Sequence, residues 1–337
     1  MTGLPVQRML AVPDSWPPTL VVVVDTEEEF DWTAPFDPAS TAVANIACQT
    51  LAQRIFDAHG VVPTYVVDYP VAAAPEAAAV LRGFAAGGRC EIGAHLHPWV
   101  TPPAEGPVDV RHSYPGNLPP ALERRKLTAL TEAIVAGFGC RPVVYKAGRY
   151  GVGPATAGIL RALGYRVDVS VVPHTDFSAD GGPDFTALPD RPFAIADGLT
   201  ELPLSVHFTG ALAGAGRRLY PLLAGRRGRR LRLPGIAARL GLLERLRLSP
   251  EGHTLADLRR QTRAALARGN RLFMLTYHSS ALLPGATGYV RDAAGRDRFL
   301  ATLDAYCGDF LGPLGGRAGT VTAVAAALEN LSVRTVT

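Results

Sequence analysis

The chain has 337 residues, of which 47% are hydrophobic and 19% charged, so it can bury a large core and is not disordered throughout. The net charge is +4, and both signs are spread along most of the chain, which gives only weak support for nucleic-acid binding. The four cysteines form no C-x-x-C pair, which argues against a zinc ribbon or a dense disulfide framework and favours a reducing compartment.

The N-terminal residues show no basic stretch followed by an apolar one, and no run reaches the roughly 18 apolar residues of a membrane span. We therefore expect a cytoplasmic protein. The length is consistent with two domains or with one large domain that contains insertions.

From residue 19 onward, the predicted elements alternate between strands and helices. The apolar, β-branched runs predict strands at residues 19–25, 61–67, 90–93, 142–145, 165–172 and 271–276. The intervening segments predict helices at residues 42–59, 75–86, 121–138, 154–163, 255–267 and 298–310. This alternation predicts an α/β fold with a parallel sheet or barrel.

Residues 211–250 break the alternation, because they are rich in Arg, Leu and Gly. Seven arginines lie close together there: Arg217, Arg218, Arg226, Arg227, Arg229, Arg230 and Arg232. The simplest interpretation is a solvated helical insertion, since basic runs usually serve solubility. The alternative is a site for an acidic partner, such as a phosphate-bearing substrate or a membrane surface.

Two carboxylates stand at the end of the first predicted strand, where the loops of a parallel barrel form its functional face. Side chains at i and i+2 of a strand point the same way, so Asp25 and Glu27 would project together, with about 6.6 Å between their Cα atoms. Such a pair is unfavourable unless a cation compensates it. The alternative for Glu27 is that it merely opens a polar loop.

A pair of histidines follows the third predicted strand. His95 and His97 form an H-x-H pair, which in extended backbone can place both imidazoles on one side as ligands for Zn²⁺ or a similar ion. Together with one carboxylate, they would leave coordination positions open for water and substrate. Two structural histidines are the alternative.

Further polar residues follow two other predicted strands. Lys146 and Arg149 are cations beside glycines, and either could keep a catalytic carboxylate ionised by direct pairing. His278 follows the predicted strand at residues 271–276, and the alternative for this residue is a hydrogen-bonded core histidine.

The order of these motifs resembles the polysaccharide deacetylase family, carbohydrate esterase family 4, also called the NodB homology domain. The resemblance covers roughly residues 19–310 apart from the Arg-rich insertion, and it rests on the segments Asp25–Glu27, Glu91–His95, Lys146–Gly151, Val167–Pro173 and Leu275–His278. It implies a distorted, seven-stranded (β/α) barrel over residues 19–337, preceded by an N-terminal extension at residues 1–18. Residues 202–205 and 278–285 are most similar to the WalW-like branch of the family.

The resemblance also implies a role for each matched residue. Asp25 would be the catalytic base and His278 the general acid, with Asp168 tuning His278. Lys146 or Arg149 would keep Asp25 charged, and the backbone N–H of Tyr150 would help to form an oxyanion hole. The remaining roles are substrate contacts by Leu275, Trp99 and Tyr277, and coordination of one divalent metal by Glu27, His95 and His97.

Three positions depart from the family pattern. Trp99 stands where the second metal-binding histidine is usual, so His97 must serve instead. Glu27 replaces an aspartate, and Lys146 stands where an arginine is expected. Zinc is the expected metal, with Co²⁺, Mn²⁺ or Ni²⁺ as alternatives.

The activity that the resemblance implies is hydrolysis of an N-acetyl amide on a sugar. A cytoplasmic location favours a glycan precursor of surface polysaccharide synthesis, such as a nucleotide- or lipid-linked acetamido sugar, whose diphosphate the Arg-rich insertion could meet. Two alternatives remain: a related amidohydrolase that acts on a cyclic amide or a formamide, and a metal-free carbohydrate-binding barrel. No nucleic-acid partner is expected, and the oligomeric state is left open.

Overall fold

Strand β2 (Thr19–Thr26) lies in the middle of the fold, and all of its residues are buried in the computed structural model, which describes residues 4–334. Its four consecutive valines are at most 1% exposed. Strand β11 pairs with it over residues 19–25, β3 pairs over residues 23–26, and β12 pairs over residues 19–20. A β-branched run of this kind is suited to a strand of a parallel sheet that is covered on both faces.

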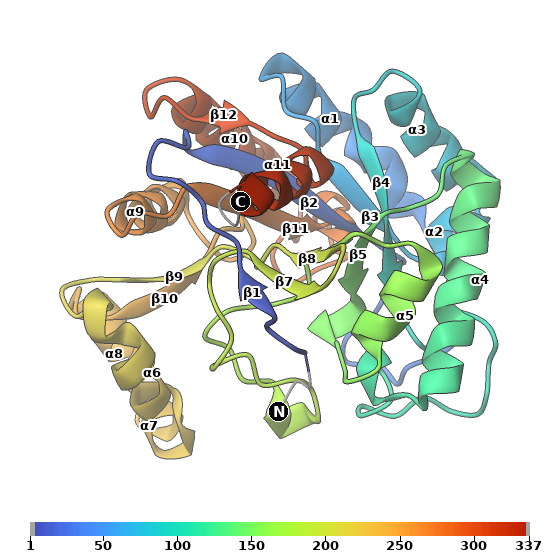
Figure 1. The fold of residues 1–337 in the computed structure, drawn as a ribbon, viewed down its shortest axis with the longest axis horizontal. Helices are drawn as coiled ribbons and strands as arrows, with labels where there is room; N and C mark the ends of the chain where they lie inside the picture. Colours follow the sequence, from blue (N-terminus) through green and yellow to red (C-terminus); the bar gives the residue numbers. More distant parts are fainter. Residues whose placement is uncertain (1–3, 335–337) are drawn as a thin grey trace.

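Ten strands form one curled sheet in the order β1-β7-β8-β6-β5-β4-β3-β2-β11, with β12 beside β2 (Figure 1). The strands besides β2 are β1 (Arg8–Met9), β3 (Thr64–Val67), β4 (Glu91–Leu96), β5 (Val144–Ala147), β6 (Val167–Asp168), β7 (Phe193–Ala196), β8 (Leu199–Glu201), β11 (Leu272–His278) and β12 (Arg317–Ala318). Within this order, the seven strands from β8 to β11 are mutually parallel. The predicted parallel barrel is therefore confirmed, with β7 and β1 added at one edge.

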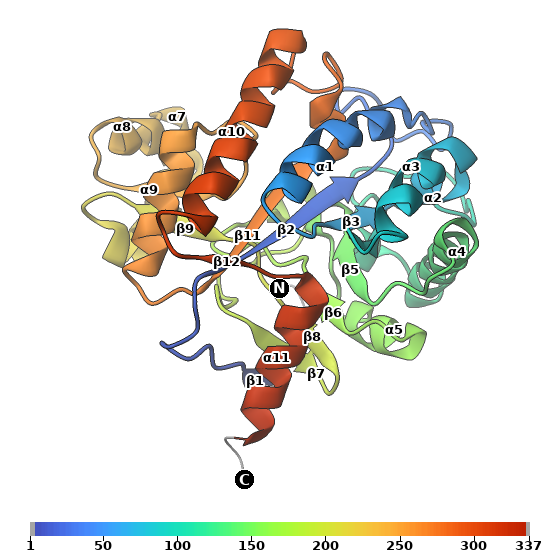
Figure 2. The same cartoon turned by 90° about the horizontal axis from the view of Figure 1, so that it is seen from above.

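Helices surround the sheet on its outer face (Figure 2). They are α1 (Gln49–Ala58), α2 (Tyr69–Ala73), α3 (Pro75–Ala85), α4 (Pro120–Phe138), α5 (Thr156–Leu163), α9 (Leu255–Leu266), α10 (Ala293–Leu311) and α11 (Val321–Arg334). Single turns of 3-10 helix lie at η1 (Ala44–Cys48), η2 (Pro115–Asn117), η3 (Gly148–Tyr150), η4 (Ser178–Asp180), η5 (Ala213–Ala215) and η6 (Ser279–Leu282). Local sequence sets several boundaries: Thr254 and Asp257 form a capping box at the start of α9, and Gly139, with φ of 70°, ends α4.

The Arg-rich segment forms a separate helical projection. Strands β9 (Val206–Thr209) and β10 (Glu244–Arg247) pair as an antiparallel ribbon. Between them, residues 210–243, called the arm below, contain the short helices α6 (Gly216–Ala224), α7 (Arg226–Arg230) and α8 (Leu233–Arg239). The arm projects away from the barrel (Figure 1). The predicted insertion at 211–250 thus ends in a strand that leads back to the barrel.

The ends of the chain also join the fold. Residues 8–9, within the predicted N-terminal extension, pair with β7 as the edge strand β1. The division into an extension and one barrel domain stays a prediction. Among residues 4–334, no helix has both the length and the apolar character to cross a membrane.

Candidate active site

The chemistry-bearing residues meet at the carboxyl ends of the parallel strands. In the sheet, Asp25 at the end of β2 lies opposite His278 of β11, and His95 of β4 lies opposite Lys146 of β5. A cavity of about 1070 Å³ opens above them. The convergence at one edge of the sheet follows from parallel topology, because every strand of a parallel sheet ends on the same side.

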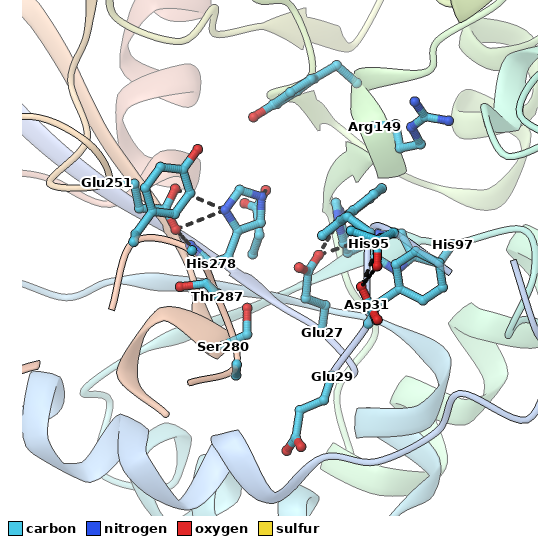
Figure 3. A pocket seen from close by; sticks show the side chains of 18 of the residues that line it. Glu27, Glu29, Asp31, His95, His97, Arg149, Glu251, His278, Ser280 and Thr287 are labelled. Carbon is cyan, nitrogen blue, oxygen red and sulfur yellow. Dashed lines mark hydrogen bonds and ion pairs between the residues drawn. The ribbon is translucent and has the colours of Figure 1, made fainter. Parts of the chain in front are cut away.

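One side of the cavity holds a cluster of three possible metal ligands, Glu27, His95 and His97 (Figure 3). Glu27 Oε2 lies 3.4 Å from His95 Nε2 and 3.4 Å from His97 Nε2. All three side chains are buried. Two imidazole nitrogens and one carboxylate oxygen that face each other make a typical donor set for a catalytic zinc ion.

Hydrogen bonds behind the two rings fix which nitrogen faces the cluster. His95 Nδ1 donates to the carbonyl of Lys146 over 3.0 Å, so its Nε2 keeps a free lone pair. His97 Nδ1 lies 2.8 Å from Glu28 Oε2. Burial lowers the pKa of His97, which favours the neutral imidazole that a metal requires. The residues therefore fit a divalent metal, and the identity of the metal stays a prediction.

Trp99 lies behind His97 rather than in the cavity wall. Its indole N–H donates to Glu28 Oε1 over 2.7 Å, and its ring stacks on that of His97 with centroids 4.3 Å apart. The backbone N–H of Glu28 in turn donates to Asp68 Oδ2. Substrate contact by Trp99 is therefore wrong. The residue supports a ligand, because a buried indole N–H requires an acceptor and finds one in Glu28.

Lys146 is the cation that pairs with Asp25. Its Nζ lies 2.5 Å from Oδ1 and 2.7 Å from Oδ2 of Asp25, and both side chains are buried. Burial alone would raise the pKa of Asp25, but the charges of Lys146 and His278 lower it to about 2. Asp25 is consequently ionised at neutral pH.

Arg149, the other candidate for this pairing, lies elsewhere. Its guanidinium sits 4.1 Å from the ring centroid of Tyr114 and donates to the Ser113 hydroxyl. Pairing of Arg149 with Asp25 is therefore wrong, and the side chain instead lines the cavity rim. The alternative that the sequence left open is resolved in favour of Lys146.

His278 has a carboxylate partner that the sequence did not reveal. Both Glu251 oxygens lie 3.0 Å from His278 Nδ1, and Glu251 Oε1 also accepts from the His278 backbone N–H (Figure 3). On the other side, His278 Nε2 lies 3.6 Å from Asp25 Oδ2. Burial alone would lower the pKa of His278, but Glu251, Glu27 and Asp25 raise it well above the ordinary value. His278 is thus protonated at neutral pH.

Asp168, which was predicted to tune His278, does not contact it. The side chain accepts from the Ser170 hydroxyl and lies in β6, beside Glu201 of β8. Strand β6 is four strands from β2 in the sheet order, whereas β11 is next to β2. The predicted role of Asp168 is therefore wrong, and Glu251 occupies that position instead.

Leu275 and Tyr277 face away from the cavity. They alternate with His278 along β11, so their side chains point to the opposite face of the strand. The Tyr277 hydroxyl donates to Gln49 Oε1 of α1, and Leu275 is fully buried. The prediction that these two side chains contact a substrate in the described cavity is therefore wrong.

The segment after β5 bends sharply at the cavity. Arg149 and Tyr150 have φ angles of 53° and 60°, a left-handed conformation that costs about 1–3 kcal/mol per non-glycine residue. The Tyr150 hydroxyl accepts a hydrogen bond of 2.7 Å from Arg247. Participation of the Tyr150 N–H in an oxyanion hole stays a prediction.

Two residues of the cavity wall, Arg247 and Glu251, escaped the sequence analysis because they were assigned to the Arg-rich insertion or its border. The available signal was local. Residues 245–248 alternate polar and apolar side chains as a half-buried strand does, and Glu251 follows directly after Ser249 and Pro250. Glu251 is therefore the first acid after the end of β10, as Glu27 is after the end of β2.

Compared as a sequence, the chain matches no family model and no curated protein. Its structure is similar to that of a protein from Mycobacterium smegmatis assigned as a polysaccharide deacetylase, with a TM-score of 0.57, 20% identity, and 98% of this chain and 96% of that chain covered. It is also similar to Puue allantoinase, with a TM-score of 0.53, 15% identity, and 94% and 93% covered. These likenesses confirm the fold that the sequence resemblance implied, and the WalW-like branch stays a prediction.

Proposed function

We propose that the protein is a metal-dependent hydrolase that removes an N-acetyl group from an acetamido sugar. The observation that carries this proposal is the meeting of four buried side chains, Asp25, Glu27, His95 and His97, at the mouth of one cavity. Across that cavity stands a protonated histidine, His278. A ligand cluster, an ionised carboxylate and an acid are the parts that amide hydrolysis requires.

Each of these residues has a defined task in the proposed reaction. A divalent metal held by Glu27, His95 and His97 would acidify a water molecule and polarise the amide carbonyl. Asp25, kept ionised by Lys146, would accept the proton of the attacking water. His278 would give its proton to the departing amine, because an amine is a poor leaving group as an anion.

Glu251 completes this arrangement as a positioning residue. It accepts from His278 Nδ1–H, which directs Nε2 toward Asp25 and the open cavity. The negative charge of Glu251 also stabilises the protonated ring. Glu251 contacts His278, and His278 lies next to Asp25, so the three side chains form a row across the floor of the cavity.

The cavity rim suits a sugar. Trp32 and Tyr289 line the cavity and are 55% and 57% exposed, so each offers an apolar ring face to the C–H groups of a pyranose. Arg149, Arg247 and Arg291 lie in the same wall. We therefore retain a nucleotide- or lipid-linked acetamido sugar as the proposed substrate class, with these arginines, rather than the arm, facing its anionic group.

Metal content and product release test the proposal together. The wild-type protein should contain about one divalent metal per chain and release acetate from acetamido sugars. Asp25→Asn should retain the metal and lose about 10²–10⁴-fold in turnover, the usual contribution of a general base. His95→Ala should lose both metal and turnover.

A control is needed because Asp25→Asn leaves the buried Lys146 without its counter-ion, which is destabilising. The double variant Asp25→Asn/Lys146→Met removes both charges and should be folded, as judged by circular dichroism, yet inactive. Full turnover in Asp25→Asn, or a wild-type protein that binds acetamido sugars without metal, would contradict the proposal.

One of the two similar structures is an allantoinase, so allantoin and a formamido sugar are assayed beside the acetamido sugars. Hydrolysis of either of these without release of acetate would move the assignment to the related amidohydrolases. The metal cluster and the roles of Asp25 and His278 would be common to both.

A further inference from the structure

The arm, residues 210–243, concentrates positive charge. It contains eight arginines and no acidic residue. The whole chain has 34 basic and 30 acidic residues. Without the arm, 26 basic and 30 acidic residues remain, so the rest of the protein is net negative. The net charge of the whole chain is therefore small although the arm is strongly basic, because the rest of the protein is acidic.

The arginines of the arm face solvent and lack counter-ions. All eight are exposed: Arg217, Arg218, Arg226, Arg227, Arg229, Arg230, Arg232 and Arg239. None forms an ion pair with an acid among residues 4–334. Some arginines of the barrel do form ion pairs, for example Arg89 with Asp57 and Arg259 with Asp309. The charge of the arm is thus available to an external partner.

Large apolar side chains are exposed on the same segment. Leu222 is 74% exposed, Leu231 64% and Leu240 66%. With Leu212, Ile236 and Leu242, the arm supplies six of the twelve large hydrophobic side chains that are exposed among the described residues. Ile236 and Leu240 are four residues apart and so lie on one side of α8 and its C-cap. Exposed leucines among arginines do not serve solubility, which was the simplest interpretation of the sequence.

Few contacts hold the arm to the rest of the protein. Tyr220 of α6 packs on Phe208 of β9, with ring centroids 5.5 Å apart, and beneath the guanidinium of Arg245 of β10. Beyond this root, the three short helices project outward (Figure 1). No residue of the arm lines the cavity described above. A partner of the arm would therefore bind outside the active site.

We propose that the arm docks on an anionic lipid bilayer. An anionic bilayer offers phosphate groups that can pair with the unpaired arginines, and hydrocarbon that can bury the exposed leucines. A nucleic acid would supply phosphates, but the exposed apolar side chains of the arm are aliphatic and cannot stack on bases. A second arm would bring eight like charges together. This inference does not depend on the proposed hydrolysis.

Docking would also place the cavity close to the membrane. Strand β10 leads from the arm to the cavity wall, where Arg247 contacts Tyr150. Arg245 of the same strand donates to the carbonyl of His174. The ribbon of β9 and β10 thus connects the arm to the wall of the cavity.

Vesicle flotation of the full chain tests the proposal. The protein should float with vesicles of phosphatidylcholine and phosphatidylglycerol in a 7:3 ratio, and should not float with pure phosphatidylcholine. The variant Arg226→Gln/Arg227→Gln/Arg229→Gln/Arg230→Gln should lose at least tenfold in affinity. The variant Leu222→Ser/Leu231→Ser/Leu240→Ser should lose a similar factor, because both charge and apolar surface contribute.

A matched control removes four exposed arginines from the barrel: Arg54→Gln, Arg124→Gln, Arg161→Gln and Arg263→Gln. It changes the net charge equally and should float like wild type. Equal loss in this control, or no flotation of the wild-type chain, would overturn the proposal. So would arm-dependent binding to an oligonucleotide, or arm-dependent dimerisation, in the absence of vesicle binding.

Discussion

Four ionisable groups face one another across the floor of the cavity, and their charges decide one another's protonation. Asp25 is held ionised by Lys146, and His278 is held protonated by Glu251 together with Glu27 and Asp25. The two partners that set these states, Lys146 and Glu251, contact the side chains of Asp25 and His278 directly. The surrounding charges thus keep the proposed base, Asp25, ionised and the proposed acid, His278, protonated.

Replacing Glu251 by Gln tests this coupling at a single position. The amide keeps a hydrogen-bond acceptor for His278 but removes the negative charge that raises its pKa. In the proposed reaction His278 must be protonated to act as an acid, so we expect activity to fall as pH rises through the pKa of His278. In Glu251→Gln, the alkaline limb of the pH–kcat profile should move to lower pH, and turnover at about pH 9 should fall tenfold or more.

The matched control is Glu105→Gln, which removes an exposed carboxylate that pairs with Arg125. Its profile should overlay that of wild type. An unmoved alkaline limb in Glu251→Gln would show that Glu251 does not set the protonation of His278, even if the variant loses activity.

The tips of β4 and β5 lie so close together that only glycine fits at one position between them. A Cβ atom at Gly148 would lie 2.3 Å from the carbonyl oxygen of Leu96 and 2.5 Å from Cδ2 of His97. Real side chains do not approach this closely, so either the loop after β5 or the His97 ring must move. The glycine is thus a requirement of the ligand cluster and not of a turn.

We expect Gly148→Ala to lower metal affinity at least tenfold while the protein stays folded, because displaced ligands cost about that much. The control is Gly158→Ala, on the exposed side of α5, where an added Cβ meets nothing within 4 Å. That change should leave metal affinity unchanged and raise the free energy of unfolding by about 1 kcal/mol through helix propensity. Metal titration of the two purified variants measures the affinity, and urea unfolding measures the stability. Wild-type affinity in Gly148→Ala would contradict the requirement for glycine at this position, since the ligand cluster would then tolerate the added Cβ atom.

The sequence predicted those elements whose residues carry a strong local pattern. The run Thr19–Asp25 and the helix at 121–138 were placed within one residue of β2 and α4. By contrast, the predicted strand at 165–172 shrinks to two residues in β6, because its ladder partners in β5 and β8 are themselves short. The ribbon of β9 and β10 was missed, since each strand is stabilised mainly by the other.

The same limit applies to the site. Residues at predicted strand ends, such as Glu27 and His95, were correctly expected to meet, because parallel topology brings strand ends together. Glu251 was not found, because its position depends on how the arm returns to the barrel. Trp99 was misplaced because the fold turns its ring behind His97, a direction that sequence spacing does not determine.

At the scale of the whole molecule, buried carboxyl groups away from the cavity link stability to pH. Asp168 and Glu201 face each other between β6 and β8, and both are fully buried. Burial raises the pKa of Asp168 to about 7, and burial together with the charge of Asp168 raises that of Glu201 well above its ordinary value. One oxygen of each side chain lacks a hydrogen-bond partner among the described residues.

A carboxyl with a raised pKa binds its proton more tightly in the folded protein than in the unfolded chain, whose carboxyl groups titrate near about 4. The folded state therefore loses stability as pH rises from about 4 toward the raised value. For this pair, the loss should extend through neutral pH.

Glu201→Gln should remove most of that loss. The amide oxygen can still accept from the Val171 N–H, as Glu201 Oε1 does, and the new NH₂ can donate to Asp168. At pH 8 the variant should therefore be more stable than wild type, by about 1–3 kcal/mol if the orphaned oxygens become paired. At pH 5 the difference should shrink, because the wild-type pair is then protonated.

Urea unfolding at the two pH values measures this difference in stability, with the exposed Glu132→Gln as control. If Glu201→Gln instead destabilises the protein equally at both pH values, the two carboxyl groups are kept in place by packing and hydrogen-bond contacts and not by a shared proton.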